Sequence, residues 1–199
     1  SAFEQLKTKV ERAAQAMLVL TIPIAVIAGI VIQPVIQLLL GLDPADTARV
    51  VLVTRVFLLG ISGHSLVELF VRSFYAMQKP RYPLLLSGLT LLFYLVFGWL
   101  LSARYEAAGI AAANTLAYTI QAVVLLILLG KVLSEKPVLL PTLGKAVLGA
   151  FLGAAAAWSV MRYAPIPGGQ FFSAVMGGLS GLMLAALILR KDLRALASL

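Results

Sequence analysis

The 199-residue chain is 61% hydrophobic and 12% charged, and its mean hydropathy is +1.01. Soluble domains typically have about 25% charged residues, so this composition excludes a water-soluble globular fold and indicates a membrane protein. A formal charge of +8 does not indicate nucleic-acid binding, because the cations lie in short connections between apolar runs. The chain has no cysteine and a single histidine, which excludes disulfides and metal clusters held by thiolates or histidines.

Residues 1–15 have the pattern of an amphipathic helix at a membrane interface. Apolar side chains recur there at steps of three and four, and charged side chains take the positions between them. A full-length apolar span follows directly, which is unlike a cleavable secretory signal. Because the chain opens with Ser1 rather than Met, we expect an N-terminal portion of a longer protein to precede it.

Six apolar stretches are long enough to cross a bilayer, for which about 20 residues are needed. Each is expected to be helical, because a backbone in hydrocarbon must satisfy its own hydrogen bonds and no stretch alternates like a barrel strand. Pro23 and Pro34 lie inside the first stretch and are expected to kink or break it. The predicted spans are residues 16–40, 50–77, 84–101, 109–129, 146–161 and 171–189.

The predicted fold is therefore an all-α membrane protein with six transmembrane helices preceded by a short amphipathic helix. Residues 16–129 form a four-helix part, residues 130–145 a cytoplasmic linker, and residues 146–199 a terminal helix pair. Small residues spaced by four in both spans of this pair favour close packing between them. These residues are Gly149, Gly153 and Ala157 in one span and Gly177, Gly181 and Ala185 in the other.

The Lys and Arg residues fall unequally on the two sides of the predicted spans. Eleven lie on the side of the N-terminus and three on the opposite side, so the positive-inside rule places both ends of the chain in the cytoplasm. The eleven are Lys7, Lys9, Arg12, Lys79, Arg81, Lys131, Lys136, Lys145, Arg190, Lys191 and Arg194, and the three are Arg49, Arg104 and Arg162.

Ionisable residues inside the second span are the main candidates for function. His64, Glu68 and Arg72 are spaced by four and so share one helix face. A mid-membrane carboxylate costs about 3 kcal/mol even on lenient scales, so Glu68 needs a partner, either Arg72 or His64. Two interpretations stay open: a structural ion pair that fixes helix packing, and a substrate or gating site. Arg72, and Arg55 near the outer end of the span, either contact a lipid phosphate or extend to the interface.

Other polar groups give weaker indications. Asn114, near the start of the fourth span, either caps its helix or bonds across helices, and base rates favour the cap.

Glu68 is the one acid inside a span, and no nucleophile with a base and an orienting third residue is evident, so enzymatic activity is not expected. We expect no metal and no cofactor.

The turn after the second span carries the clearest motif. Residues 72–83, R-S-F-Y-A-M-Q-K-P-R-Y-P, resemble the R-x-F-Y-A-x-Q-D-T-R-T-P signature of the MurJ (MviN-type) lipid II flippases, in the multidrug/oligosaccharidyl-lipid/polysaccharide exporter superfamily. The match includes Phe74, Tyr75, Arg81 and Pro83, whereas Lys79 and Pro80 replace the Asp and Thr of the signature. Residues 21–26 and 108–115 are similar to the family's ninth and twelfth helices, so the six spans correspond to helices nine to fourteen.

This resemblance implies the C-terminal part of a flippase that moves an undecaprenyl-linked peptidoglycan precursor across the bacterial inner (cytoplasmic) membrane by alternating access. The partners it implies are membrane lipid, this substrate, and the missing N-terminal helices of the same transporter, where most of the family's cavity arginines lie. Two alternatives stay open: a flippase for another polysaccharide lipid or a drug/cation antiporter of the same superfamily, and a non-transporting membrane scaffold fragment.

Overall fold

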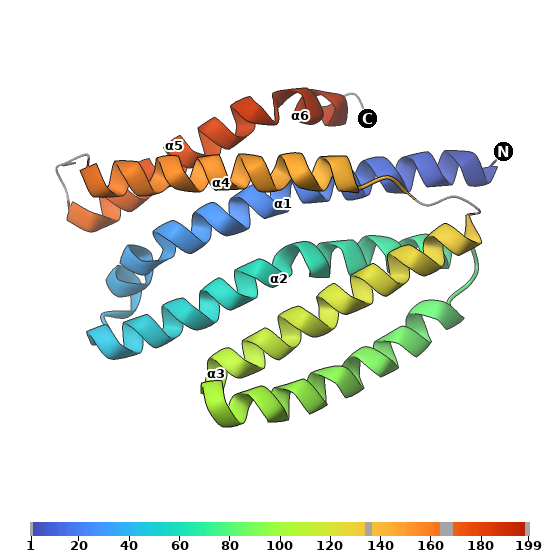
Figure 1. Cartoon of the computed structure of the whole chain (residues 1–199), viewed down its shortest axis with the longest axis horizontal. Coiled ribbons are helices and arrows are strands. Elements are labelled where there is room, and N and C mark those ends of the chain that lie inside the picture. The colour runs from blue at the N-terminus through green and yellow to red at the C-terminus, as the bar shows by residue number, and fades with distance from the viewer. Residues whose placement is uncertain (1, 134–136, 164–168, 198–199) are drawn as a thin grey trace. The chain divides into compact units, whose positions relative to one another are not determined.

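A computed structural model describes residues 2–133, 137–163 and 169–197, and every element within these ranges is a helix. The predicted all-helical fold is confirmed, and five of these described helices are long and apolar enough to cross a membrane. Ser1 and Lys136, on which two predictions depend, lie outside the described residues. The helices, shown in Figure 1, are α1 (Ala2–Leu40), α2 (Pro44–Ala76), α3 (Arg81–Val132), α4 (Leu140–Tyr163), α5 (Gly169–Ile188) and α6 (Arg190–Ala197).

Helix α3 contains both the third and the fourth predicted spans. It has 52 residues, or about 78 Å at 1.5 Å per residue, which is far more than the roughly 30 Å of a bilayer's hydrocarbon core. Glu106 within it has a non-helical backbone (φ 51°, ψ −130°), where two helices meet at a kink. Figure 1 shows that α3 reverses direction part-way along its length. Gln121 Nε2 donates a hydrogen bond to Ser87 Oγ at 3.4 Å across the reversal. The two spans are therefore a first arm (81–105) and a second arm (107–132) of one helical hairpin.

Gly109 allows this reversal to be close. A Cβ atom at Gly109 would lie 2.7 Å from the backbone nitrogen of Ser102 and closer still to the carbonyl group of Leu101. Backbone atoms cannot move aside as the end of a flexible side chain can, so the two arms meet here only because the residue has no side chain.

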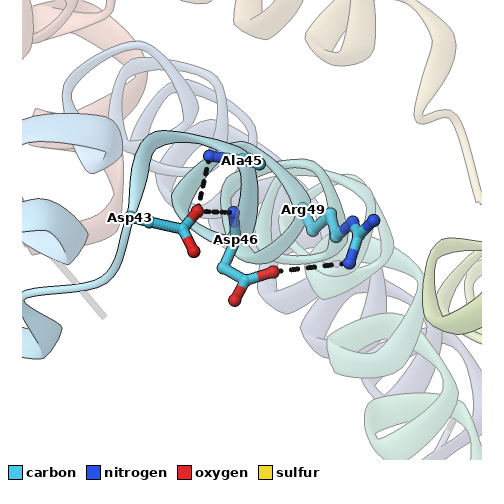
Figure 2. Close-up of polar contacts among 4 residues, drawn as sticks. All are labelled: Asp43, Ala45, Asp46 and Arg49. Carbon is cyan, nitrogen blue, oxygen red and sulfur yellow. Dashed lines mark hydrogen bonds and ion pairs between the residues drawn. The ribbon is translucent and has the colours of Figure 1, made fainter.

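Helix α2 begins with a strong N-cap, shown in Figure 2. Asp43 Oδ1 accepts hydrogen bonds from the backbone N–H groups of Ala45 (2.8 Å) and Asp46 (2.9 Å). Pro44 takes the first helical position, where a missing N–H costs nothing. The helix thus starts six residues before the predicted span at residue 50, because its capping turn is helical although too polar for hydrocarbon.

Helix α1 runs without interruption from Ala2 to Leu40, so the predicted amphipathic helix and first span form one element. Pro23 and Pro34 lie inside it and do not break it. Transmembrane helices tolerate proline when neighbouring groups satisfy the freed backbone atoms. In its first fifteen residues Val10 is buried whereas Arg12 is exposed, as an amphipathic pattern requires. The interfacial location of this segment stays a prediction.

The chain divides into two compact units. Unit 1 consists of Ser1–Met17 and Gly60–Pro141, and so holds the start of α1, the end of α2 and both arms of α3. Unit 2 consists of Leu18–Leu59 and Thr142–Leu199, and so holds the rest of α1 and α2 together with α4, α5 and α6.

Helices α4 and α5 pack closely in unit 2, as the two strips of small residues predict. A Cβ atom on Gly181 would lie 2.5 Å from the carbonyl oxygen of Gly153, and one on Gly177 would lie 2.8 Å from that of Ala157. All six strip residues are buried, and Ile27 of α1 shares a core cluster with Ala157 and Ala185. The predicted packing of the last two spans is therefore confirmed.

The connection before α4 is shorter than the linker predicted at residues 130–145. Helix α3 extends to Val132 and α4 begins at Leu140, while residues 134–136 lie outside the described part of the chain. The short helix α6 was not predicted. It is held to α4 by an ion pair between Lys145 Nζ and Asp192 Oδ1 at 3.0 Å.

Candidate functional site

The four ionisable candidates of α2 belong to two different units. His64, Glu68 and Arg72 lie in the part of α2 assigned to unit 1, and Arg55 lies in the part assigned to unit 2.

His64 contacts the second arm of α3 through two neighbouring side chains. Its Nε2 lies 2.9 Å from Asn114 Oδ1, and its ring stacks on Tyr118 with centroids 3.8 Å apart and planes at 26°. In the tautomer protonated at Nε2, the histidine donates this hydrogen bond. Asn114 therefore bonds across helices, and the expected helix cap is wrong. Asn114 lies more than a turn beyond Glu106, past the free N–H groups that a cap would bind.

Two glycines bring the backbones of α2 and the second arm together at this level. A Cβ atom on Gly60 would lie 2.8 Å from Thr115 Oγ1, and one on Gly63 would lie 3.0 Å from Thr119 Oγ1. Such small residues let membrane helices approach closely. His64 follows Gly63 directly, so its polar contact lies at the edge of this close approach.

Removing either member of the His64–Asn114 contact is expected to destabilise unit 1. His64→Leu and Asn114→Leu should each lower the free energy of unfolding by about 1–2 kcal/mol. The double variant should lose less than the sum, because a single change leaves one polar group unpaired. Thermal unfolding in detergent measures the effect. His64→Leu combined with the exposed Lys131→Gln should be additive, and additivity of the first pair would contradict the contact.

Glu68 and Arg72 form an ion pair one turn apart on α2. Arg72 Nη2 donates a hydrogen bond to Glu68 Oε1, so Arg72 rather than His64 is the partner of this carboxylate. The side chains of Arg72 and Glu68 are 73% and 64% exposed, which places the pair on the surface of the described structure. Mutual neutralisation lowers the free-energy cost of holding both groups within a span.

Arg55 is held by the backbone of α1. Its Nε donates a hydrogen bond of 2.7 Å to the carbonyl oxygen of Gly29, and its Cγ lies 3.8 Å from where a Cβ of Gly29 would be. The terminal Nη1 and Nη2 groups bond to no other described residue. A guanidinium fixed on one edge with its remaining donors free is suited to bidentate binding of a phosphate or carboxylate.

The predicted turn motif ends α2 with a Schellman cap. The N–H of Lys79 donates to the carbonyl of Phe74 and that of Gln78 to the carbonyl of Tyr75, both at 2.9 Å. Gln78 has the left-handed backbone (φ 56°) that this cap requires. Glycine is the usual residue at this position, so the sequence contained no signal for the cap.

The four motif residues have different environments in the turn. Phe74 and Pro83 are fully buried, and the Phe74 ring lies 5.4 Å from the ring of Tyr82. Tyr75 and Arg81 are exposed. Phe74 and Pro83 therefore form part of the packing of the turn, whereas the side chains of Tyr75 and Arg81 are accessible to ligands or partners.

Comparison with known proteins agrees with this arrangement. A family model described as "MurJ: Lipid II flippase MurJ" matches residues 3–187. A solved structure, "Lipid II flippase MurJ, inward closed conformation", is similar in fold with a TM-score of 0.75 at 17% identity, covering 94% of this chain and 40% of that one. The chain therefore spans less than half the length of that protein. No curated protein matches. Because the family model covers nearly the whole sequence, the chain belongs to the MurJ lipid II flippase family.

Proposed function

We propose that this chain is the C-terminal part of a lipid II flippase, which moves an undecaprenyl-linked peptidoglycan precursor across the bacterial inner membrane by alternating access. The family match over residues 3–187 carries this proposal, because it names the lipid II flippases and not the other exporters or a scaffold. An alternating-access cavity lies between two opposed halves of a transporter. The N-terminal helices of the same transporter are therefore the proposed partner. The distribution of Lys and Arg supports a cytoplasmic location for both ends of this chain.

Among the ionisable residues of α2, Arg55 is well placed to contact the anionic headgroup of the transported substrate. Its Nε bond to Gly29 fixes the guanidinium, and its two terminal groups stay free for phosphate oxygens. Arg72 differs, because a phosphate must compete with Glu68 for it. That exchange makes the Glu68–Arg72 pair a candidate gate, whereas His64 positions α2 against the second arm through Asn114. No enzymatic step is part of the proposal.

Complementation in a bacterium depleted of its own lipid II flippase tests the function. The gene, expressed with any coding sequence that precedes Ser1 in its genome, should restore growth and expose the precursor on the outer leaflet. The 199-residue chain alone should insert and not restore growth, because it covers 40% of the similar flippase and supplies one side of the proposed cavity. Rescue by the chain alone would contradict the proposed partner, and failure of the inserted full gene would contradict the flippase.

Arg55→Gln is expected to reduce precursor flipping about tenfold to a hundredfold, because a hydrogen bond to a charged group contributes about 1.5–3 kcal/mol. The flipping rate of Arg55→Lys should be intermediate. A lysine ammonium cannot bond to the carbonyl oxygen of Gly29 and at the same time form two parallel hydrogen bonds to a phosphate. Arg49→Gln is the matched control, because Arg49 is exposed on the same helix and paired with Asp46 at 3.4 Å. Flipping by Arg55→Gln at the control's rate, at equal membrane abundance, would exclude this role for Arg55.

A further inference from the structure

An open hollow of about 660 Å³ lies in unit 1 at the turn between α2 and α3. Its volume is in the range of roughly 300–1,000 Å³ that is common for small-molecule sites. Its lining includes none of the groups assigned to transport, which are Arg55, Glu68 and Arg72. The lining residues are Gln78, Lys79, Pro80, Arg81, Tyr82 and Leu85.

Two positive charges on this hollow have no acidic partner among the residues that the structure describes. Lys79 and Arg81 are both exposed, and neither forms an ion pair with any described residue. The sequence contains no Asp or Glu at positions 69–105, so no acid lies nearby along the chain. The hollow therefore attracts an anion.

The same hollow continues onto an apolar surface. Leu85 lines it with 70% exposure, and the neighbouring Leu84 is 72% exposed, at the start of the first arm of α3. This arm belongs to α3, one of the helices that are long and apolar enough to cross a membrane. A ligand that uses both parts of the surface has an anionic group joined to hydrocarbon, which a small soluble anion lacks.

The backbone of the turn is held by contacts within the turn itself. The Schellman cap fixes Gln78 and Lys79, and the buried Phe74 supports the ring of Tyr82. Pro80 and the buried Pro83 restrict the backbone on either side of Arg81. A pre-ordered site loses less conformational entropy on binding than a flexible loop.

We propose that this hollow binds a membrane glycerophospholipid with an anionic headgroup, such as phosphatidylglycerol. Its phosphodiester lies beside Lys79 and Arg81, and its acyl chains lie along Leu85 and the first arm of α3. A turn that joins two membrane-crossing segments lies at headgroup depth, where basic side chains attract anionic lipids. The bound lipid is a resident of the membrane rather than the transported substrate, so the proposal does not depend on the proposed function.

Photo-crosslinking in nanodiscs tests the site with the whole chain. A benzoylphenylalanine replaces Leu85, the nanodiscs contain phosphatidylcholine with a minor fraction of phosphatidylglycerol, and mass spectrometry identifies the captured lipid. Phosphatidylglycerol should be captured well above its share of the bilayer. Lys79→Gln with Arg81→Gln should lower this enrichment by up to about 25-fold, because each cation near an anionic lipid surface contributes roughly fivefold.

Three controls make the result specific. Lys131→Gln with Lys191→Gln removes the same charge outside the hollow and should keep the enrichment, and so should the charge-preserving Lys79→Arg with Arg81→Lys. Glycerol 3-phosphate should not displace the lipid. Capture of both lipids in proportion to their abundance would overturn the proposal. Displacement by glycerol 3-phosphate would show a site for soluble anions, and preferential displacement by a polyprenyl diphosphate would show a substrate site; either would overturn it.

Discussion

Gly109→Ala is expected to lower the free energy of unfolding by at least about 3 kcal/mol, at the upper end of the range for overpacked interiors. The added methyl group would lie 2.7 Å from the backbone nitrogen of Ser102 and closer still to the carbonyl of Leu101. Both obstacles are main-chain atoms, so relief requires the two arms of α3 to separate. Separation in turn weakens the hydrogen bond between Gln121 and Ser87.

Gly88→Ala is the matched control for this change. Gly88 lies in the first arm of the same helix, and a Cβ atom there would meet nothing within 4 Å. Alanine is favoured over glycine in a helix by up to about 1 kcal/mol, so this variant should unfold at the same temperature or slightly higher. Tryptophan fluorescence during heating in detergent gives both unfolding midpoints. Equal midpoints for the two variants would show that the reversal is not closed at Gly109.

The second large effect is expected at the contact of α4 with α5. In Gly181→Ala the new Cβ would lie 2.5 Å from the carbonyl oxygen of Gly153 and 3.1 Å from the Cβ of Ala157. The helices must move apart, which removes packing along both strips, and we expect a loss of about 2–3 kcal/mol. The same thermal unfolding experiment measures it.

Gly144→Ala serves as the comparison on α4, because nothing lies within 4 Å of the position of its Cβ. It should leave the unfolding temperature unchanged or slightly raised. The reciprocal variant Gly153→Ala should behave like Gly181→Ala, since its Cβ would lie 2.7 Å from the carbonyl oxygen of Gly181. If only one of these two variants were destabilised, the mutual contact between the strips would be contradicted.

Features with a local imprint on the sequence were predictable. The spans follow from hydropathy, and the packing of α4 on α5 follows from small residues spaced by four, because period and residue size are visible in single segments. The interruption at residues 102–108 could also be predicted from the drop in hydropathy. The close approach of the two arms could not, because it depends on Gly109 contacting the backbone of Leu101, and no local pattern indicates that contact.

In the candidate site, too, the contact between neighbouring turns of one helix could be predicted from the sequence, and the contacts between distant positions could not. Arg72 as the partner of Glu68 was one of two predicted possibilities, since residues four apart meet on a helix. The contact of His64 with Asn114 joins positions 50 apart, and that of Arg55 with Gly29 joins positions 26 apart. Nothing in the intervening residues specifies such pairs. The left-handed backbone conformation of Gln78 could not be predicted either, because residues other than glycine rarely adopt it.

The short reversal within α3 bears on how this region enters the bilayer during synthesis. Residues 102–108 are all that separate the two predicted spans, and this short connection holds few polar groups, Arg104 and Glu106 among them. Gln121 and Ser87 satisfy each other once the arms have closed, so neither amide nor hydroxyl faces hydrocarbon alone. Both arms can then leave the insertion machinery as a preassembled hairpin, rather than partition into lipid one after the other.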